Sequence, residues 1–243
     1  MRNATLAADL FSGMGIFGVV LLIALTVFVV IMVKQIAGRR RRRMVLRERA
    51  QLTKVLHFHQ LMSTNDYLKE LLVTQQADPG DTLLVIAREQ KAGRGQFEHT
   101  WSSPPGGLYA SLLYWPRRPV TDQSELSLLT AQTLCDVLTG QGMGDLHVKA
   151  PNDLYAGEGK LAGILLEASG EAGWLVIGIG VNVRRPRHHS FEGGAYLSDE
   201  LKNETPEDVA EELFPVLLER IKVWDVDIPE SGRRVSDKGE EPR

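Results

Sequence analysis

The sequence predicts an α+β fold, a mostly antiparallel sheet with helices packed on one side of it, preceded by one transmembrane helix. Short apolar segments separated by turns that contain Gly predict the sheet, because they follow the pattern of a hairpin meander. Segments with apolar residues at helical spacing predict the helices. Residues 10–33 carry no charge, and this run exceeds the roughly 20 residues that a helix needs to cross a hydrocarbon core.

A basic run follows the apolar run, with five arginines that begin at Arg39 and end at Arg43. Basic flanks stay on the cytoplasmic side of a membrane. We therefore expect a single-pass membrane protein with its N-terminus outside and the remainder in the cytoplasm. In the simplest interpretation the arginines only fix this topology. In the alternative they also bind anionic headgroups, so membrane lipids are an expected partner. The run gives little reason to expect nucleic acid.

Four segments are predicted along the 243 residues. They are a transmembrane anchor at residues 1–34, a basic juxtamembrane helix and linker at 35–54, a folded domain at 55–227 and a disordered tail at 228–243. The tail is rich in Pro, Gly, Ser and charge and too poor in apolar residues to order itself. A single cysteine, Cys135, excludes an intrachain disulfide and a cysteine-based zinc site. Its apolar neighbours indicate a buried structural thiol.

The elements of the folded domain can be predicted in order. Residues 44–57 indicate a helix that leads into a strand, and Ser63-Thr64-Asn65-Asp66 indicates the cap of the next helix. Further helices are predicted at 126–138 and, behind a Thr205 cap, at 206–224. Strands are predicted at 82–87, 108–115, 146–148, 154–155, 161–167 and 174–183. Residues 88–107 form a loop of a length that is unusual inside a domain unless it is functional.

This long loop carries the first candidate site residues, Gln90 and Gly93-Arg94-Gly95-Gln96. Glycines on both sides of an arginine let the backbone approach a ligand and turn its N–H groups toward an anion. Arg94 adds a planar charged fork that suits phosphate or carboxylate. The same residues also fit a flexible surface loop, so this motif by itself leaves both interpretations open.

A second candidate cluster follows 50 to 70 positions later, with Asn152-Asp153 at a turn and Lys160 at the start of an apolar strand. An aspartate there can bind Mg²⁺ or orient a nucleophile, and an asparagine can bridge to a phosphate oxygen. A lysine at a strand end can equally extend to solvent. Together with the Ser-Thr-Asn cap, these loops are expected to converge on one concave site.

In this order, the motifs resemble the catalytic domain of biotin–protein ligases, within the biotin/lipoate ligase superfamily. The resemblance extends over residues 55–224. It is carried by Ser63-Thr64-Asn65, residues 90–95, Trp101-Ser102-Ser103-Pro104, Pro151-Asn152-Asp153, residues 160–165 and Gly180-Val181-Asn182-Val183.

The resemblance implies a ligase that uses ATP and Mg²⁺ to activate biotin as biotinyl-5′-AMP. The biotinyl group then passes to a lysine of a biotin carboxyl carrier protein. Catalytic roles are implied for Lys160, Arg94 and Asp153, with Asp153 also as the Mg²⁺ ligand. The implied biotin-binding residues are Ser63, Thr64, Asn65, Gln90, Arg94, Gly95, Gln96, Lys160 and Gly163. The implied ATP-binding residues are Arg94, Gln96, Trp101, Asn152, Asp153, Lys160 and Asn182.

Three positions depart from the family pattern. Gln96 replaces the second arginine of the loop, Glu98 places an anion where the family gathers cations, and Ala150 replaces a tryptophan. One lost charge-assisted contact costs about 1.5–3 kcal/mol, which weakens activity without abolishing it. The further barrel-like domain and the DNA-binding domain of some relatives are not expected, and neither is a repressor role. The alternatives are a non-catalytic protein that binds biotin or its carrier, and a lipoate or octanoate ligase of the same fold.

Overall fold

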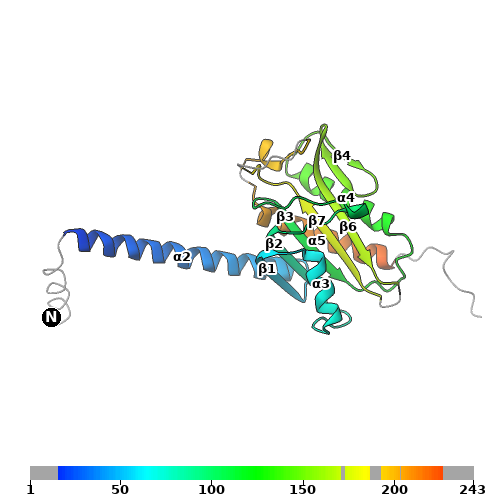
Figure 1. The fold of residues 1–243 in the computed structure, drawn as a ribbon, viewed down its shortest axis with the longest axis horizontal. Coiled ribbons are helices and arrows are strands. Elements are labelled where there is room, and N and C mark those ends of the chain that lie inside the picture. Colours follow the sequence, from blue (N-terminus) through cyan, green and yellow to red (C-terminus); the bar gives the residue numbers. More distant parts are fainter. Residues whose placement is uncertain (1–15, 171–172, 187–192, 203, 227–243) are drawn as a thin grey trace, which may run out of the picture. The chain divides into compact units, whose positions relative to one another are not determined.

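The computed structural model describes residues 16–170, 173–186, 193–202 and 204–226, with the backbone alone at residues 16–19, 35–37, 39–43 and 98. The chain divides into two compact units after Val45. The elements in order are α2 (Ile16–Arg49), β1 (Lys54–Leu61), α3 (Thr64–Val73), β2 (Leu83–Gln90), β3 (Leu108–Tyr114), α4 (Gln123–Gly140), β4 (Leu146–Lys149), β5 (Asp153–Ala156), β6 (Gly159–Ala168), β7 (Leu175–Val181) and α5 (Pro206–Val226), as Figure 1 shows.

The predicted single-pass membrane location is wrong by the criterion of helix length and hydropathy. Among the residues whose side chains the structure describes, none belongs to a helix long and apolar enough to span a membrane. The predicted anchor extends into residues 1–15, and the predicted tail occupies residues 228–243. Both of these stretches, and the side chains of residues 39–43, lie outside the description.

The sheet has seven strands in the order β1-β2-β3-β7-β6-β5-β4. It is mixed, because β1 and β2 pair in parallel while all other neighbours pair antiparallel. Parallel neighbours need a crossover connection, and α3 supplies it between β1 and β2. The predicted meander is therefore confirmed for β4 to β7, and the parallel pair was not predicted.

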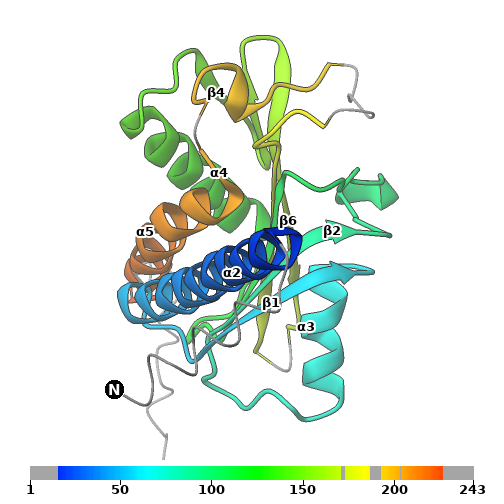
Figure 2. The ribbon, with the colours of Figure 1, turned by 90° about the vertical axis from the view of Figure 1, so that its left-hand side faces the viewer.

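The prediction that helices cover one side of the sheet is wrong. Helix α3 lies on one face, and α4 and α5 lie on the other, as Figure 2 shows. Each face has its own core, and neighbouring residues of one strand alternate between them: Leu84 belongs to the core of α4 and α5, and Val85 to the core of α3. The continuous apolar sequence of β2 agrees with this arrangement, because a strand covered on both faces has no polar side.

The predicted boundaries of α3, α4 and α5 are confirmed to within a few residues, and local caps explain where α3 and α5 begin. Helix α2 runs without a break across the predicted boundary between anchor and juxtamembrane segment at residue 34. The backbone N–H of Asp66 donates to the Ser63 hydroxyl at 3.4 Å at the start of α3, and the N–H of Asp208 donates to the Thr205 hydroxyl at 3.2 Å at the start of α5. Such caps satisfy N–H groups that have no partner within the helix. Cys135 is half-buried on α4, where burial raises the pKa of its thiol, in line with a structural role.

Candidate active site

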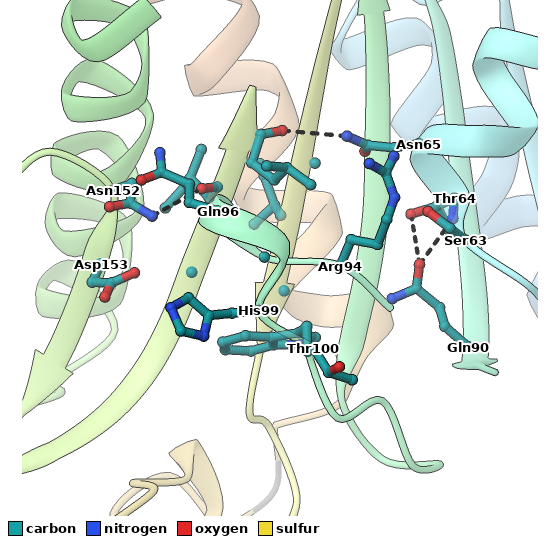
Figure 3. Close-up of a pocket in the computed structure, with 18 of the residues that line it drawn as sticks. Ser63, Thr64, Asn65, Gln90, Arg94, Gln96, His99, Thr100, Asn152 and Asp153 are labelled. Carbon is teal, nitrogen blue, oxygen red and sulfur yellow. Dashed lines mark hydrogen bonds between the residues drawn. The ribbon is translucent and has the colours of Figure 1, made fainter. Parts of the chain in front are cut away.

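A pocket of about 250 Å³ opens where α3, β2, β5, β6 and β7 approach the loop after β2. Asn152 and Asp153 lie on one side of it, Thr64 and Gln90 on the other, and Arg94 between them (Figure 3). Its lining comprises Ser63, Thr64, Asn65, Gln90, Arg94, Gly95, Gln96, Phe97, His99, Thr100, Trp101, Asn152, Asp153, Lys160, Gly163, Ile164, Leu165, Gly178, Ile179 and Gly180.

The pocket contains every predicted site residue except Asn182. The Asn182 side chain donates from Nδ2 to the backbone carbonyl of Lys160 at 3.1 Å. It therefore lies behind the pocket wall and supports the backbone that carries Lys160. Glu98, which was predicted to weaken the site, has a side chain outside the description, and Ala150 is not among the lining residues.

The Ser-Thr-Asn cap is tied to the end of β2 through Gln90. The Gln90 Oε1 atom accepts from the backbone N–H of Thr64 at 2.8 Å and from its hydroxyl at 3.1 Å. The Gln90 Nε2 atom donates to Ser103 Oγ at 2.9 Å, and that hydroxyl donates to the carbonyl of Trp101 at 3.1 Å. Both ends of the long loop are thus fastened to the start of α3, which makes that wall of the pocket rigid.

Buried polar groups behind this wall continue the network. Ser111 Oγ lies 2.7 Å from Thr64 Oγ1 and 2.5 Å from Asn65 Oδ1, and Ser111 is completely buried in β3. A buried hydroxyl without partners is costly, so this serine fixes the side chains of Thr64 and Asn65. Ser111 was not predicted as a site residue, although a lone serine in the apolar sequence of β3 is the signal that could have identified it.

Arg94 is held by two carboxylates that the sequence analysis did not assign to the site. Its NH2 donates to Asp66 Oδ1 at 2.6 Å and to Glu167 Oε2 at 2.9 Å. Burial by itself would lower the pKa of Arg94, but the hydrogen bond and charge of Glu167 and the charge of Asp66 outweigh it and raise that pKa. Glu167 follows Gly163 and Leu165 at every second position of β6, and this strand spacing places all three on one face.

Lys160 and Asp153 form the second ion pair, with Lys160 Nζ 2.8 Å from Asp153 Oδ2. A register shift between β5 and β6 pairs Leu154 with Ala162 but Tyr155 with Lys160, so Leu161 is an extra residue in β6. Such a bulge changes which face the next side chain points to. It explains how Lys160 and Gly163, three positions apart, both line the pocket.

Paired glycines form the floor of the pocket. Gly163 lies opposite Gly180 in the β6–β7 ladder, and the Trp101 indole covers both. A Cβ atom at Gly180 would lie 2.5 Å from Trp101 Nε1, and one at Gly163 would lie 3.0 Å from its Cζ3. Gly180 therefore has to be glycine for the indole to lie this close to the strand, whereas a Cβ atom at Gly163 would require a shift of only a few tenths of an ångström. The Nζ of Lys160 lies 5.5 Å from the centre of this ring, within the range of a cation–π contact.

The loop residues after Arg94 close a small turn over the pocket. The N–H of Gly95 donates to the carbonyl of His99 at 2.7 Å, and the N–H of His99 donates back to the carbonyl of Gln96 at 3.0 Å. Gln96, Phe97 and His99 all line the pocket, and the Phe97 side chain is also largely exposed. His99 was not predicted as a site residue, and the turn brings it to the pocket.

A metal ion in the pocket would be coordinated by Asp153 and by oxygen atoms of a bound substrate. Within the described part of the chain, no three His, Cys, Asp or Glu side chains lie close enough to hold a metal among themselves. The Oδ1 atom of Asp153 is buried and has no hydrogen-bond partner among the described residues. Mg²⁺ is commonly bound through one or two carboxylates together with substrate phosphates, so the free oxygen of Asp153 fits that mode of binding.

Comparison with known proteins agrees with this fold and pocket. The model of the biotin/lipoate A/B protein ligase family matches residues 55–183. The bifunctional ligase/repressor BirA of Escherichia coli (strain K12) is 38% identical over 129 residues, which are 51% of this chain and 39% of that protein. The biotin–[acetyl-CoA-carboxylase] ligase of Paracoccus denitrificans is 38% identical over 141 residues, 55% of this chain and 58% of that protein. The chain thus spans 39–58% of the length of these two relatives.

Solved structures give the same result. The biotin protein ligase from Aquifex aeolicus in complex with biotin and ATP superimposes with a TM-score of 0.62 and 26% identity, covering 72% of each chain. The biotin acetyl coenzyme A carboxylase synthetase from Helicobacter pylori with bound biotinylated ATP gives a TM-score of 0.54 and 26% identity, covering 69% of this chain and 74% of that one.

The mixed sheet and its pocket therefore define an α+β domain with the fold of biotin protein ligases. The chain belongs to the biotin/lipoate A/B protein ligase family.

Proposed function

We propose that this protein is a biotin–[biotin carboxyl carrier protein] ligase. It joins biotin to ATP with release of pyrophosphate and then transfers the biotinyl group from biotinyl-5′-AMP to a carrier lysine. One observation carries the proposal: the pocket brings together the Ser-Thr-Asn cap, the Gly-Arg-Gly loop, Asp153 and Lys160. The names of the relatives, which refer to biotin ligases, support biotin over lipoate or octanoate.

The chemistry requires two anions to meet. An oxygen of the biotin carboxylate attacks the α-phosphorus of ATP, and the bond from that phosphorus to the pyrophosphate oxygen breaks. Negative charge gathers on the phosphate as this occurs, so positive groups fixed beside it lower the barrier. Lys160 and Arg94 are the cations of the pocket. Lys160 is proposed to touch both the carboxylate and the α-phosphate, and Arg94 to close over biotin and the adenylate.

The remaining lining residues divide between the two substrates. Ser63, Thr64, Asn65, Gln90, Gly95, Gln96 and Gly163 are proposed to line the biotin side, and Gln96 is proposed to contact ATP as well. Asn152, Asp153 and Trp101 are proposed to serve ATP, with Asn182 acting from behind Lys160. Mg²⁺ on the free oxygen of Asp153 would neutralise phosphate charge. In the second step the carrier amine attacks the biotinyl carbonyl carbon, and AMP leaves.

The test uses the full chain with ATP, Mg²⁺ and biotin. Pyrophosphate release is measured first, and labelling of a biotin carboxyl carrier domain is then measured with avidin. Pyrophosphate release that depends on biotin, followed by carrier labelling, is the expected result. Release with octanoate or lipoate but not with biotin would replace the proposal by the acyl-ligase alternative. Biotin binding without turnover under any of these conditions would instead identify a non-catalytic binding protein.

A further inference from the structure

Glu167 is a charged residue beside the pocket to which the proposed reaction assigns no task. Its carboxylate accepts three side-chain hydrogen bonds. Oε2 accepts from Asn65 Nδ2 at 2.7 Å and from Arg94 NH2 at 2.9 Å, and Oε1 accepts from Lys69 Nζ at 2.7 Å. Only 22% of the Glu167 side chain is exposed. Burial by itself would raise the pKa of this carboxyl, but the three donors outweigh it and lower the pKa, so the group is ionised at neutral pH.

The first consequence concerns Asn65, which lines the pocket. Its Nδ2 donates to Glu167 and lies 3.4 Å from the carbonyl of Leu165, while its Oδ1 faces Ser111. A Cβ atom at Gly178 would lie 2.4 Å from this Oδ1, so the amide packs directly on the strand. With both ends bonded, the Asn65 side chain has one orientation, and Glu167 provides its short donor contact.

The second consequence concerns Arg94. Its side chain is 39% exposed, and Arg94 lies on a loop between two glycines, so the backbone alone does not fix the guanidinium. Asp66 on α3 and Glu167 on β6 hold the same NH2 atom from two different elements. An ion pair at a partly exposed site is weak when isolated but stronger within a network. Here the network joins Asp66, Lys69, Arg94 and Glu167.

We propose that Glu167 is a positioning residue for substrate binding in the reaction proposed above: it holds Arg94 and Asn65 in place and does not itself touch the substrate. This inference rests on the proposed function for the identity of the substrate, biotin. Because Glu167 shapes the pocket before the reaction begins, its loss raises KM for biotin more than it lowers kcat. The expected increase is roughly ten-fold, the size of one lost charge-assisted hydrogen bond.

The test is a double-mutant cycle on the full chain. Glu167→Gln keeps the volume of the side chain and removes its charge, and it is made alone and together with Arg94→Ala. KM and kcat for biotin and the free energy of unfolding without ligand are measured for all four proteins. The matched control is Glu89→Gln, a glutamate on β2 that is 18% exposed, pairs with Lys91 at 3.8 Å and does not line the pocket.

Glu167→Gln is expected to raise KM in the wild-type background and to have a several-fold smaller effect when Arg94 is absent. Glu89→Gln is expected to leave KM unchanged. An equal rise in KM in both backgrounds, or a fall in kcat with KM unchanged, would overturn the inference. The part of the double-mutant cycle that measures the free energy of unfolding needs no substrate. Strictly additive changes in that free energy for Glu167→Gln and Arg94→Ala would also overturn the inference. A wild-type chain that neither binds nor activates biotin would overturn the proposed function instead.

Discussion

Lys160 Nζ lies 2.8 Å from Asp153 Oδ2, across two neighbouring strands, and this pair has a counterpart in Arg94 and Glu167 on the other side of the pocket. Each cation that lines the pocket and is named in the proposed reaction is thus paired with a carboxylate before a ligand arrives. An unpaired charge at a partly buried position is costly. The carboxylates therefore hold the two cations in place before an anionic substrate binds.

Replacing Lys160 by alanine is expected to lower biotin-dependent pyrophosphate release by at least roughly one to two powers of ten, because a charge-assisted contact of about 1.5–3 kcal/mol is lost. The matched control is Lys149→Ala, a lysine at the end of β4 that lies over the Tyr155 ring and does not line the pocket. Full activity in Lys160→Ala would show that the proposed catalytic role is wrong.

Replacing Gln96 by arginine is expected to improve ATP use, because Gln96 lines the pocket where the family has a second arginine. One charge-assisted contact to phosphate would lower KM for ATP by roughly ten-fold. The measurement is pyrophosphate release at varied ATP concentration. The control is Gln76→Arg, because Gln76 is exposed and lies three residues after the end of α3. An equal decrease of KM for ATP in both variants would show that the added net charge, and not its position in the pocket, causes the effect.

Replacing Gly180 by alanine is expected to displace the Trp101 indole and to reduce activity, because the new Cβ would lie 2.5 Å from Nε1 and 2.6 Å from Cε2 of that ring. Overpacking of this kind costs about 1–3 kcal/mol of stability. Chemical unfolding and pyrophosphate release are the two measurements. Gly140→Ala, where no atom lies within 4 Å of the new Cβ, is expected to leave both unchanged or to stabilise the chain slightly.

The raised pKa of the Tyr114 hydroxyl leads us to expect that the protein loses stability at alkaline pH. Burial, together with the hydrogen bond to Asp225 at 3.0 Å, raises the pKa of Tyr114 to about 12. The unfolded chain releases this proton near pH 10, whereas the folded protein holds it to about pH 12. The contribution of Tyr114 is therefore complete below about pH 10 and is lost as the pH rises toward 12. Between these pH values the free energy of unfolding should fall less steeply with pH for Tyr114→Phe than for the wild-type chain. An equal slope in the two proteins would contradict this prediction.

Much of the fold could be predicted because the signals are local. The strands β4 to β7, the caps at Ser63 and Thr205 and the helix boundaries follow from turn residues and from apolar spacing within a few positions. The candidate site residues could also be identified, since their motifs are short and occur in a fixed order. The membrane location, which was inferred from the hydropathy of the sequence, was wrong: among the residues that the structure describes, no helix is long and apolar enough to cross a membrane.

The sequence by itself determined the order of the elements, the resemblance to biotin–protein ligases and the two cations of the pocket. Only the tertiary structure decided the placement of α3 opposite α4 and α5, the bulge that turns Lys160 toward Asp153, and the position of Glu167 beside Arg94. Arg94 and Glu167 are 73 residues apart in the chain. No local pattern connects residues at that separation, because their contact depends on how the strands are ordered in the sheet and on the register between them.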